Sequence, residues 1–236
     1  MSLSRVAWHK VSAGYGGTTV IEGIDFEVGR GERIGILGRN GAGKTTTLAA
    51  AMGSAQIRAG QVTFDGVPVD RLSTSRRSRR GLAHVPQTRD VFKSLTVEEN
   101  LLAGLQGGPR SRLDLAYDLF PRLAERRRNT GSALSGGEQQ MLSIARALMA
   151  DPKIILMDEP LEGLAPVVAQ EVMETIRRLA AAEGLGVVLV EQHVRAVMAF
   201  CERILVLERG RPVFWGATSA LETHPAILDR AIGLAH

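Results

Sequence analysis

A glycine-rich segment follows a short apolar run near the start of the chain. The apolar run, Ile34–Leu37, predicts a buried strand, and Gly38-Arg39-Asn40-Gly41-Ala42-Gly43-Lys44-Thr45 comes directly after it. Glycines let the backbone turn tightly and point successive N–H groups at an anion, and a helix that starts here adds its positive N-terminal end. The sequence therefore predicts a phosphate-binding loop between a strand and a helix. We expect nucleotide contacts from Gly38, Asn40, Gly41, Ala42, Gly43, Lys44, Thr45 and Thr46.

Apolar runs of strand length alternate with stretches of helical spacing, which indicates an α/β fold with a mostly parallel core sheet. Ile34–Leu37, Ile154–Met157 and Val187–Val190 are short, apolar and bounded by glycine, proline or charge. We therefore expect them to be buried central strands. Gln61–Val69 and Ile204–Trp215 each contain a glycine turn and predict hairpins, which would add an antiparallel β edge.

A Leu- and Arg-rich insert, roughly residues 94–129, separates the first central strand from the second. Leucine and aromatic residues recur in it at helical spacing, so together with the helix that follows it predicts a helical lobe of about residues 94–150. A chain of 236 residues that is 44% hydrophobic can bury one sizeable core, and we expect residues 1–236 to form a single domain. The lone Cys201 excludes an internal disulfide and favours a small core residue.

Two adjacent carboxylates, Asp158 and Glu159, end the predicted strand Ile154–Met157. In an open α/β sheet, ligands bind at the carboxyl ends of the strands, so these side chains would lie at the phosphate loop. Neighbouring strand residues point to opposite sides, which favours two different tasks. Asp158 would orient Mg²⁺, which the Thr45 hydroxyl would ligate. Glu159 would deprotonate the attacking water, and Lys44 would contact the β and γ phosphates.

A second anion-binding helix is predicted to begin at Ser135. Ser135 and Glu138 have the spacing of a capping box, and Asp151-Pro152 would stop the helix. Gly136 and Gly137 leave the first N–H groups bare of side chains, so a phosphate can approach closely. One compact chain cannot easily place both this helix and the phosphate loop on the same ATP molecule.

The order of phosphate loop, Leu134-Ser135-Gly136-Gly137-Glu138 and apolar strand with Asp-Glu resembles the ATPases of ABC transporters over the whole chain. The resemblance implies a P-loop NTPase cassette with ATP and Mg²⁺ as cofactors. It also implies a head-to-tail pair with a second cassette, identical or paralogous. Ser135, Gly136 and Gly137 would then contact the γ-phosphate held by Lys44 of the partner subunit. By the same resemblance, Tyr15 would stack on adenine, Gln87 would contact Mg²⁺ and the attacking water, and His193 would contact the γ-phosphate.

Within this family, four segments look like the shorter ATPase of the branched-chain amino acid importers. They are Leu95-Thr96-Val97-Glu98-Glu99-Asn100-Leu101, Leu119-Phe120-Pro121-Arg122-Leu123, Leu134–Leu142 and Gly163-Leu164-Ala165-Pro166. The chain departs from that group at Gln87, where Glu often stands, and at Leu161, where Ser is usual. Importers of urea and short amides have nearly the same cassette, and a soluble ABC ATPase of an assembly complex is a further alternative. The importer group implies transmembrane permease subunits and, indirectly, a solute-binding protein.

Charge and hydropathy bear on partners and location. The net charge of +4 comes mostly from arginine, clustered in 71–80 and 126–128, and no aromatic residues interleave for base stacking. We therefore expect no nucleic-acid partner. Arg76, Arg77, Arg79 and Arg80 are expected to form a surface that faces solvent, lipid or a partner. The apolar runs are far shorter than the ~20 residues that span a bilayer, and no signal peptide opens the chain. These features favour a cytoplasmic protein that acts peripherally on the inner face of the membrane.

Overall fold

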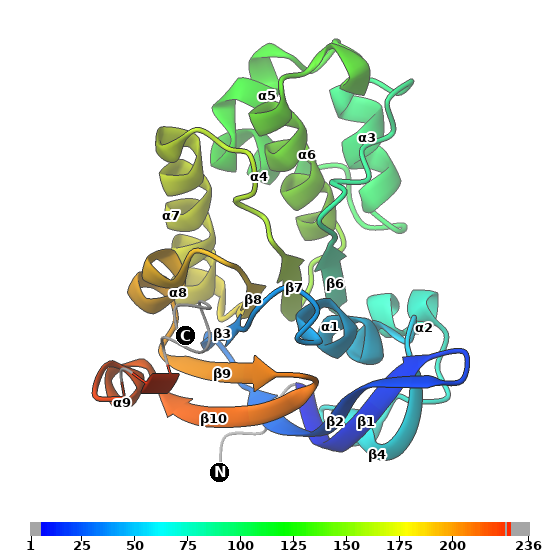
Figure 1. Cartoon of the computed structure of the whole chain (residues 1–236). Coiled ribbons are helices and arrows are strands. Elements are labelled where there is room, and N and C mark those ends of the chain that lie inside the picture. Colours follow the sequence, from blue (N-terminus) through cyan, green and yellow to red (C-terminus); the bar gives the residue numbers. More distant parts are fainter. Residues whose placement is uncertain (1–5, 225, 228–236) are drawn as a thin grey trace.

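A six-stranded sheet forms the centre of the computed structural model, which describes residues 6–224, 226 and 227 (Figure 1). Its strands, from edge to edge, are β10 (Arg211–Ala217), β9 (Arg203–Glu208), β3 (Arg33–Leu37), β8 (Gly186–Val190), β7 (Ile154–Asp158) and β6 (Leu82–Val85). All neighbours are parallel except β10, which is antiparallel to β9. The three predicted central strands are confirmed as β3, β7 and β8, and the predicted hairpin Ile204–Trp215 is β9 and β10.

A second, antiparallel sheet lies against this one, at the bottom right of Figure 1. Its strands, in order, are β2 (Thr18–Val28), β1 (Val6–Tyr15), β4 (Gln56–Phe64) and β5 (Val67–Pro68). The predicted hairpin Gln61–Val69 is confirmed as β4 and β5. The sequence did not predict β1 and β2, because the pairing register of β1 shifts between Trp8 and Val11 and again between Val11 and Ala13. These irregularities interrupt the alternation of buried and exposed residues that marks a strand.

The two faces of the large sheet pack against separate hydrophobic clusters. In β7, Ile154 and Leu156 belong to the cluster shared with the second sheet, whereas Ile155 and Met157 belong to the cluster shared with the helical lobe. Helix α1 (Lys44–Met52) packs in the first cluster, and the Trp8 indole donates to a carbonyl of this helix at 3.1 Å. Burial on both faces explains why these strands are apolar throughout rather than alternating.

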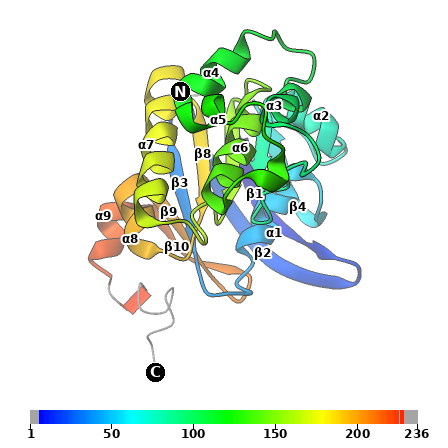
Figure 2. The same cartoon turned by 90° about the horizontal axis from the view of Figure 1, so that it is seen from above.

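The predicted helical lobe lies above the sheets in Figure 1 and is seen from another side in Figure 2. Its helices are α3 (Val97–Gly104), α4 (Arg112–Leu119), α5 (Pro121–Glu125), a 3-10 turn at Gly131–Ala133, and α6 (Gly136–Leu148). The predicted capping box of Ser135 and Glu138 is present at the start of α6, and α6 ends before Asp151. Thr96 and Glu99 form a second capping box at the start of α3. Each satisfies N–H groups that a helix end otherwise leaves unpaired.

The remaining helices are α2 (Thr74–Arg79), α7 (Pro166–Glu183), α8 (Val194–Phe200) and α9 (Thr218–Glu222). Helices α7 and α8 lie side by side in both views and line a shared groove. Cys201, directly after α8, is buried as predicted, and burial raises the pKa of its thiol. Within the part of the chain that the structure describes, no helix is both long and apolar enough to cross a membrane.

The arginine run at 76–80 corrects one expectation. Its other arginines are exposed, but Arg77 is only 2% exposed. The Arg77 guanidinium donates to the carbonyls of Ala50 and Ala51 at 2.8 and 2.7 Å, in the last turn of α1. It also donates to two carbonyls in the loop before α2. Arg77 is therefore a buried cap on α1, because a guanidinium can satisfy carbonyls that the helix end leaves free.

We expect Arg77→Ala to lower the free energy of unfolding by about 3 kcal/mol, since it leaves buried carbonyls without a charged donor. The melting temperature should fall by roughly 6–12 °C, which thermal unfolding followed by circular dichroism would measure. Arg76→Ala removes the same charge from an exposed neighbour and should melt within a few degrees of wild type. Equal melting temperatures for the two variants would contradict the capping role.

Candidate active site

The phosphate loop lies between β3 and α1, as the sequence predicts. Gly43 is the N-cap residue of α1 with φ +100°, and a Cβ at this position would lie 2.5 Å from Ile21 Cγ2, so a side chain has no room. Lys44 is 5% exposed, and its Nζ donates to the Gly38 carbonyl at 2.9 Å. The first turn of α1 contains no acidic residue. A helix end with these properties suits a phosphate group.

A pocket at this loop collects residues from five separate segments of the chain. Its lining comprises Val20, Asn40, Gly41, Gly43, Lys44, Thr45, Thr46, Gln87, Glu159, Glu162 and Gln192. Most of the residues predicted to contact the nucleotide or the attacking water are therefore brought together. Gly38 lines an adjoining pocket with Asn40 and Gln192, while Ala42 is buried and its carbonyl accepts from the Gly210 N–H at 3.1 Å.

Asp158 ends β7 and is 2% exposed. Burial is the main cause that raises the pKa of its carboxyl, and a hydrogen bond with Thr45 opposes that rise. Within the described residues, Asp158 Oδ1 is buried without a hydrogen-bond partner. An orphaned carboxylate oxygen beside a hydroxyl is a donor set that suits Mg²⁺, which binds through few protein ligands and completes its shell with phosphates and water. No group of three or more His, Cys, Asp or Glu residues that could hold a metal exists in the described ranges.

Glu159 is the first residue after β7 and has a left-handed backbone, with φ +48°. Its carboxylate accepts from Gln192 Nε2 at 2.9 and 2.8 Å and from Gln87 Nε2 at 3.2 Å. Lys44 Nζ lies 3.8 Å from Glu159 Oε1. The Gln87 amide also donates to Glu162 at 2.7 Å. Two amides and one cation thus converge on the carboxylate predicted to be the general base.

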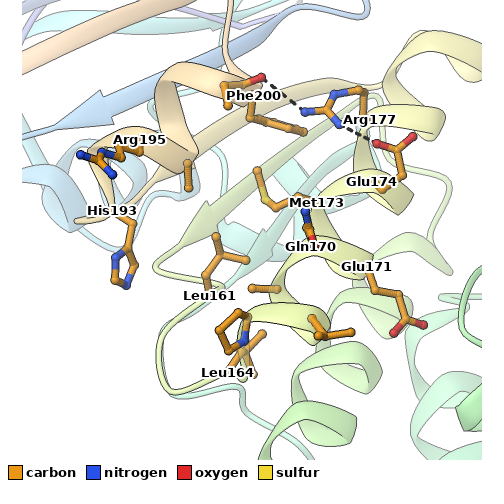
Figure 3. Close-up of a pocket in the computed structure, with 15 residues that line it drawn as sticks. Leu161, Leu164, Gln170, Glu171, Met173, Glu174, Arg177, His193, Arg195 and Phe200 are labelled. Carbon is orange, nitrogen blue, oxygen red and sulfur yellow. Dashed lines mark hydrogen bonds and ion pairs between the residues drawn. The ribbon is translucent and has the colours of Figure 1, made fainter.

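The structure does not bring His193 to this cluster, although the resemblance implies that it contacts the γ-phosphate. Gln192 lies beside Glu159 instead, because its side chain points from the end of β8 into the phosphate-loop pocket. His193 is exposed and lines the groove between α7 and α8, together with Leu161 and Arg195 (Figure 3). Consecutive residues at a strand end point to different sides, so only one of the two can face the loop.

The predicted phosphate contacts on α6 and the predicted adenine contact Tyr15 also lie outside the phosphate-loop pocket. None of the described residues that line it comes from Ser135, Gly136 or Gly137. These three begin α6 on the helical lobe, and the Ser135 hydroxyl accepts from the Glu138 N–H at 3.3 Å. Tyr15 ends β1 and is 47% exposed, on the hairpin whose Val20 lines the pocket.

Comparison with known proteins identifies the family. The sequence model of the family described as ABC transporter matches residues 21–162, which include the phosphate loop, Ser135 and both carboxylates. The chain belongs to the ABC transporter family. It is therefore an ATPase, whose hydrolysis of ATP powers transport, and the ABC cassette accounts for both its sheets and its helical lobe.

This ABC protein is 40% identical over 232 residues to the high-affinity branched-chain amino acid transport ATP-binding protein BraG of Pseudomonas aeruginosa, covering 97% of the chain and 99% of BraG. It is 36% identical over 213 residues to the lipopolysaccharide export system ATP-binding protein LptB of Escherichia coli, covering 88% of each. A solved structure, described as a dimeric post-hydrolysis state of an ATP-binding cassette bound to ADP and Pi, has a TM-score of 0.80. It is 25% identical and covers 90% of this chain and 98% of that one.

The sequence did not identify three residues that lie at or beside the site of this ABC cassette, namely Gln192, Arg89 and Glu191. Gln192 was passed over in favour of the neighbouring histidine. Arg89 packs beside the start of α6, with its Nη1 2.9 Å from where a Cβ on Gly136 would lie, and donates to the Glu162 carbonyl at 3.1 Å. Glu191 is 1% exposed at the end of β8. A polar residue that closes an apolar strand signals a site, and that signal marks Glu191 and Gln192 as clearly as it marks Asp158.

Proposed function

We propose that the chain is the ATP-hydrolysing subunit of an importer for branched-chain amino acids. The observation that carries this proposal is the 40% identity to BraG, a branched-chain amino acid transport protein, across nearly the full length of both chains. The 36% identity to LptB over 88% of each chain supports a second candidate, a subunit of a lipopolysaccharide export system. BraG is favoured because both the identity and the coverage are higher.

The geometry supports a direct attack of water on the γ-phosphate of ATP. Lys44 would exchange its contacts with Gly38 and Glu159 for oxygens of the β and γ phosphates. Glu159 would accept a proton as the water oxygen bonds to the γ-phosphorus and the bond from that phosphorus to ADP breaks. Gln87, which already donates to Glu159, would hold the water, and Tyr15 would stack on adenine. Positioning and charge stabilisation supply most of the catalysis in such reactions.

Mg²⁺ is part of this proposal. Asp158 and Thr45 would hold the ion, with Gln87 beside it, because Asp158 Oδ1 is a buried acceptor without a partner among the described residues. Bound Mg²⁺ would neutralise charge on the β and γ phosphates. The hydrogen bond between Asp158 and Thr45 would also hold β7 beside the phosphate loop.

The proposed assembly is a head-to-tail pair of cassettes that act on transmembrane permease subunits at the inner face of the membrane. Ser135, Gly136 and Gly137 would complete the site around Lys44 of the partner subunit, which fits their position outside their own chain's phosphate-loop pocket. The structural relative described as a dimer supports pairing. Residues 1–236 would act as one domain, and a solute-binding protein would deliver the solute to the permeases.

Deletion of the gene should lower uptake of radiolabelled leucine, isoleucine and valine by whole cells, because the permeases lose their source of energy. The wild-type gene should restore uptake, and a gene that encodes Glu159→Gln should not. Urea uptake, measured in parallel, should stay unchanged. Unchanged amino acid uptake together with lipopolysaccharide retained in the inner membrane would overturn the importer assignment in favour of the export candidate.

A further inference from the structure

Glu191 is a buried carboxylate to which the proposed hydrolysis mechanism gives no role. It is 1% exposed, and its Oε1 accepts from the Leu161 backbone N–H at 2.8 Å. Its Oε2 accepts from the Gln192 backbone N–H at 3.2 Å. Burial raises the pKa of Glu191, these two N–H groups oppose the rise, and the charge of Glu159 adds to it. A buried carboxylate needs hydrogen-bond partners, and these two backbone N–H groups supply them.

The turn after β7 is what Glu191 contacts. Glu159 has φ +48°, a left-handed conformation that costs a non-glycine residue free energy and persists only where neighbours hold it. The Glu159 N–H donates to the Val190 carbonyl at 2.8 Å, so the turn crosses directly over the end of β8. Two residues further on, two contacts hold Leu161. Its backbone N–H donates to Glu191, and its side chain, which is 6% exposed, lines the α7–α8 groove (Figure 3).

Gln192 completes the arrangement from the other side. Its backbone N–H is held by Glu191, while its side-chain amide donates to both oxygens of Glu159. The Glu191 carboxylate therefore bridges the two segments that define where the Glu159 carboxylate lies: the backbone beyond Glu159 and the residue that bonds its side chain. A shift of either segment would move the carboxylate, because a left-handed non-glycine residue keeps its conformation only where its neighbours hold it.

We propose that Glu191 is a positioning residue for ATP hydrolysis, which acts through the Leu161 and Gln192 backbone N–H groups to keep Glu159 and Gln192 in register. Glu191 lines the adjoining pocket with Gly38 and Asn40 rather than the pocket of Glu159, and its hydrogen bonds go to these two backbone N–H groups. The inference rests on the ATPase activity and on the proposed role of Glu159, and is independent of the transported solute. Misplacement of a catalytic group by about 1 Å is enough to cost roughly a hundredfold in rate.

The test compares steady-state ATPase kinetics, nucleotide affinity and melting temperature for Glu191→Ala, Glu191→Gln and Glu174→Gln. Glu191→Ala should lower kcat roughly ten- to a hundredfold, with nearly unchanged KM and ATP affinity, because the phosphate loop is intact. Glu191→Gln keeps a carbonyl oxygen for the Leu161 N–H and should recover a large part of kcat. Glu174→Gln, an exposed carboxylate on α7, should match wild type. A merely structural role predicts instead that melting temperature falls and that kcat of the folded fraction stays normal.

A double-mutant cycle tests whether Glu191 and Gln192 act on Glu159 together or independently. Gln192→Ala and Glu191→Ala should be non-additive, with a double variant that is about as slow as the slower single variant, because both act on Glu159 through the same contacts. Additive losses, or kcat in Glu191→Ala within twofold of wild type, would overturn the positioning role. Glu159→Gln, assayed alongside, distinguishes a failure of the positioning role from a failure of the general-base assignment. A slow Glu159→Gln with a normal Glu191→Ala removes only the positioning role, whereas a fast Glu159→Gln removes the assignment of the base itself.

Discussion

Replacement of Glu159 by Gln should slow ATP hydrolysis by about two orders of magnitude or more while ATP binding is retained. The amide has the shape of the carboxylate and still offers one carbonyl oxygen to the side chains of Gln192 and Gln87, which bond Glu159 at 2.8 to 3.2 Å. It cannot accept a proton from water, so the general base is lost without loss of the pocket. ATP should then accumulate at the site and trap the closed pair of cassettes.

Single-turnover hydrolysis and equilibrium titration with a fluorescent ATP analogue would measure the two effects separately. Glu162→Gln is the matched control, because Glu162 accepts from the same Gln87 amide at 2.7 Å but lies at the exposed rim of the pocket. This variant should keep most of the activity. Hydrolysis by Glu159→Gln at near the wild-type rate would remove Glu159 from the catalytic role, and a loss of ATP affinity would show that it acts in binding instead.

The features that sequence predicted well are those with local causes. The loop from Gly38 to Thr45 is recognisable because a phosphate cradle needs glycines at fixed spacing and a helix directly after it. Ile154–Met157 and Val187–Val190 are recognisable because a strand buried on both faces must be apolar at every position. The capping box of Ser135 and Glu138 depends only on residues three apart, and it forms as expected.

The features that sequence missed depend on contacts between distant residues. Nothing in the arginine run sets Arg77 apart from Arg76, since its burial follows from the carbonyls of Ala50 and Ala51, which precede it by more than twenty positions. Nothing local decides whether Gln192 or His193 faces the phosphate loop, because the direction depends on how β8 ends beside Glu159. The resemblance to a family supplied a role for the histidine, and the geometry gives that place to the glutamine.

The most sensitive test of the paired cassettes compares two variants at the two anion-binding helices. Lys44→Ala should weaken ATP binding itself, because it removes a charge-assisted contact worth roughly 1.5–3 kcal/mol, or about ten- to a hundredfold in affinity. Ser135→Arg should leave the ATP affinity of the isolated subunit nearly unchanged, since Ser135 does not line its own chain's phosphate-loop pocket. It should nevertheless abolish turnover, because it places a bulky cation where the second cassette must close.

Protein concentration provides the control for this comparison, because closure of two cassettes is bimolecular when the permeases are absent. The ATPase rate per mole of wild-type protein should rise with concentration, while Ser135→Arg stays inactive at every concentration and still binds nucleotide. Sedimentation would report the fraction of dimer at each point, and nucleotide titrations would report affinity for all three proteins. If wild-type specific activity stays flat down to concentrations where only monomer sediments, or if Ser135→Arg still turns over ATP, then one chain completes its own site. The first turn of α6 would then have to reach the phosphate loop of its own chain, although the structure places this turn on the helical lobe.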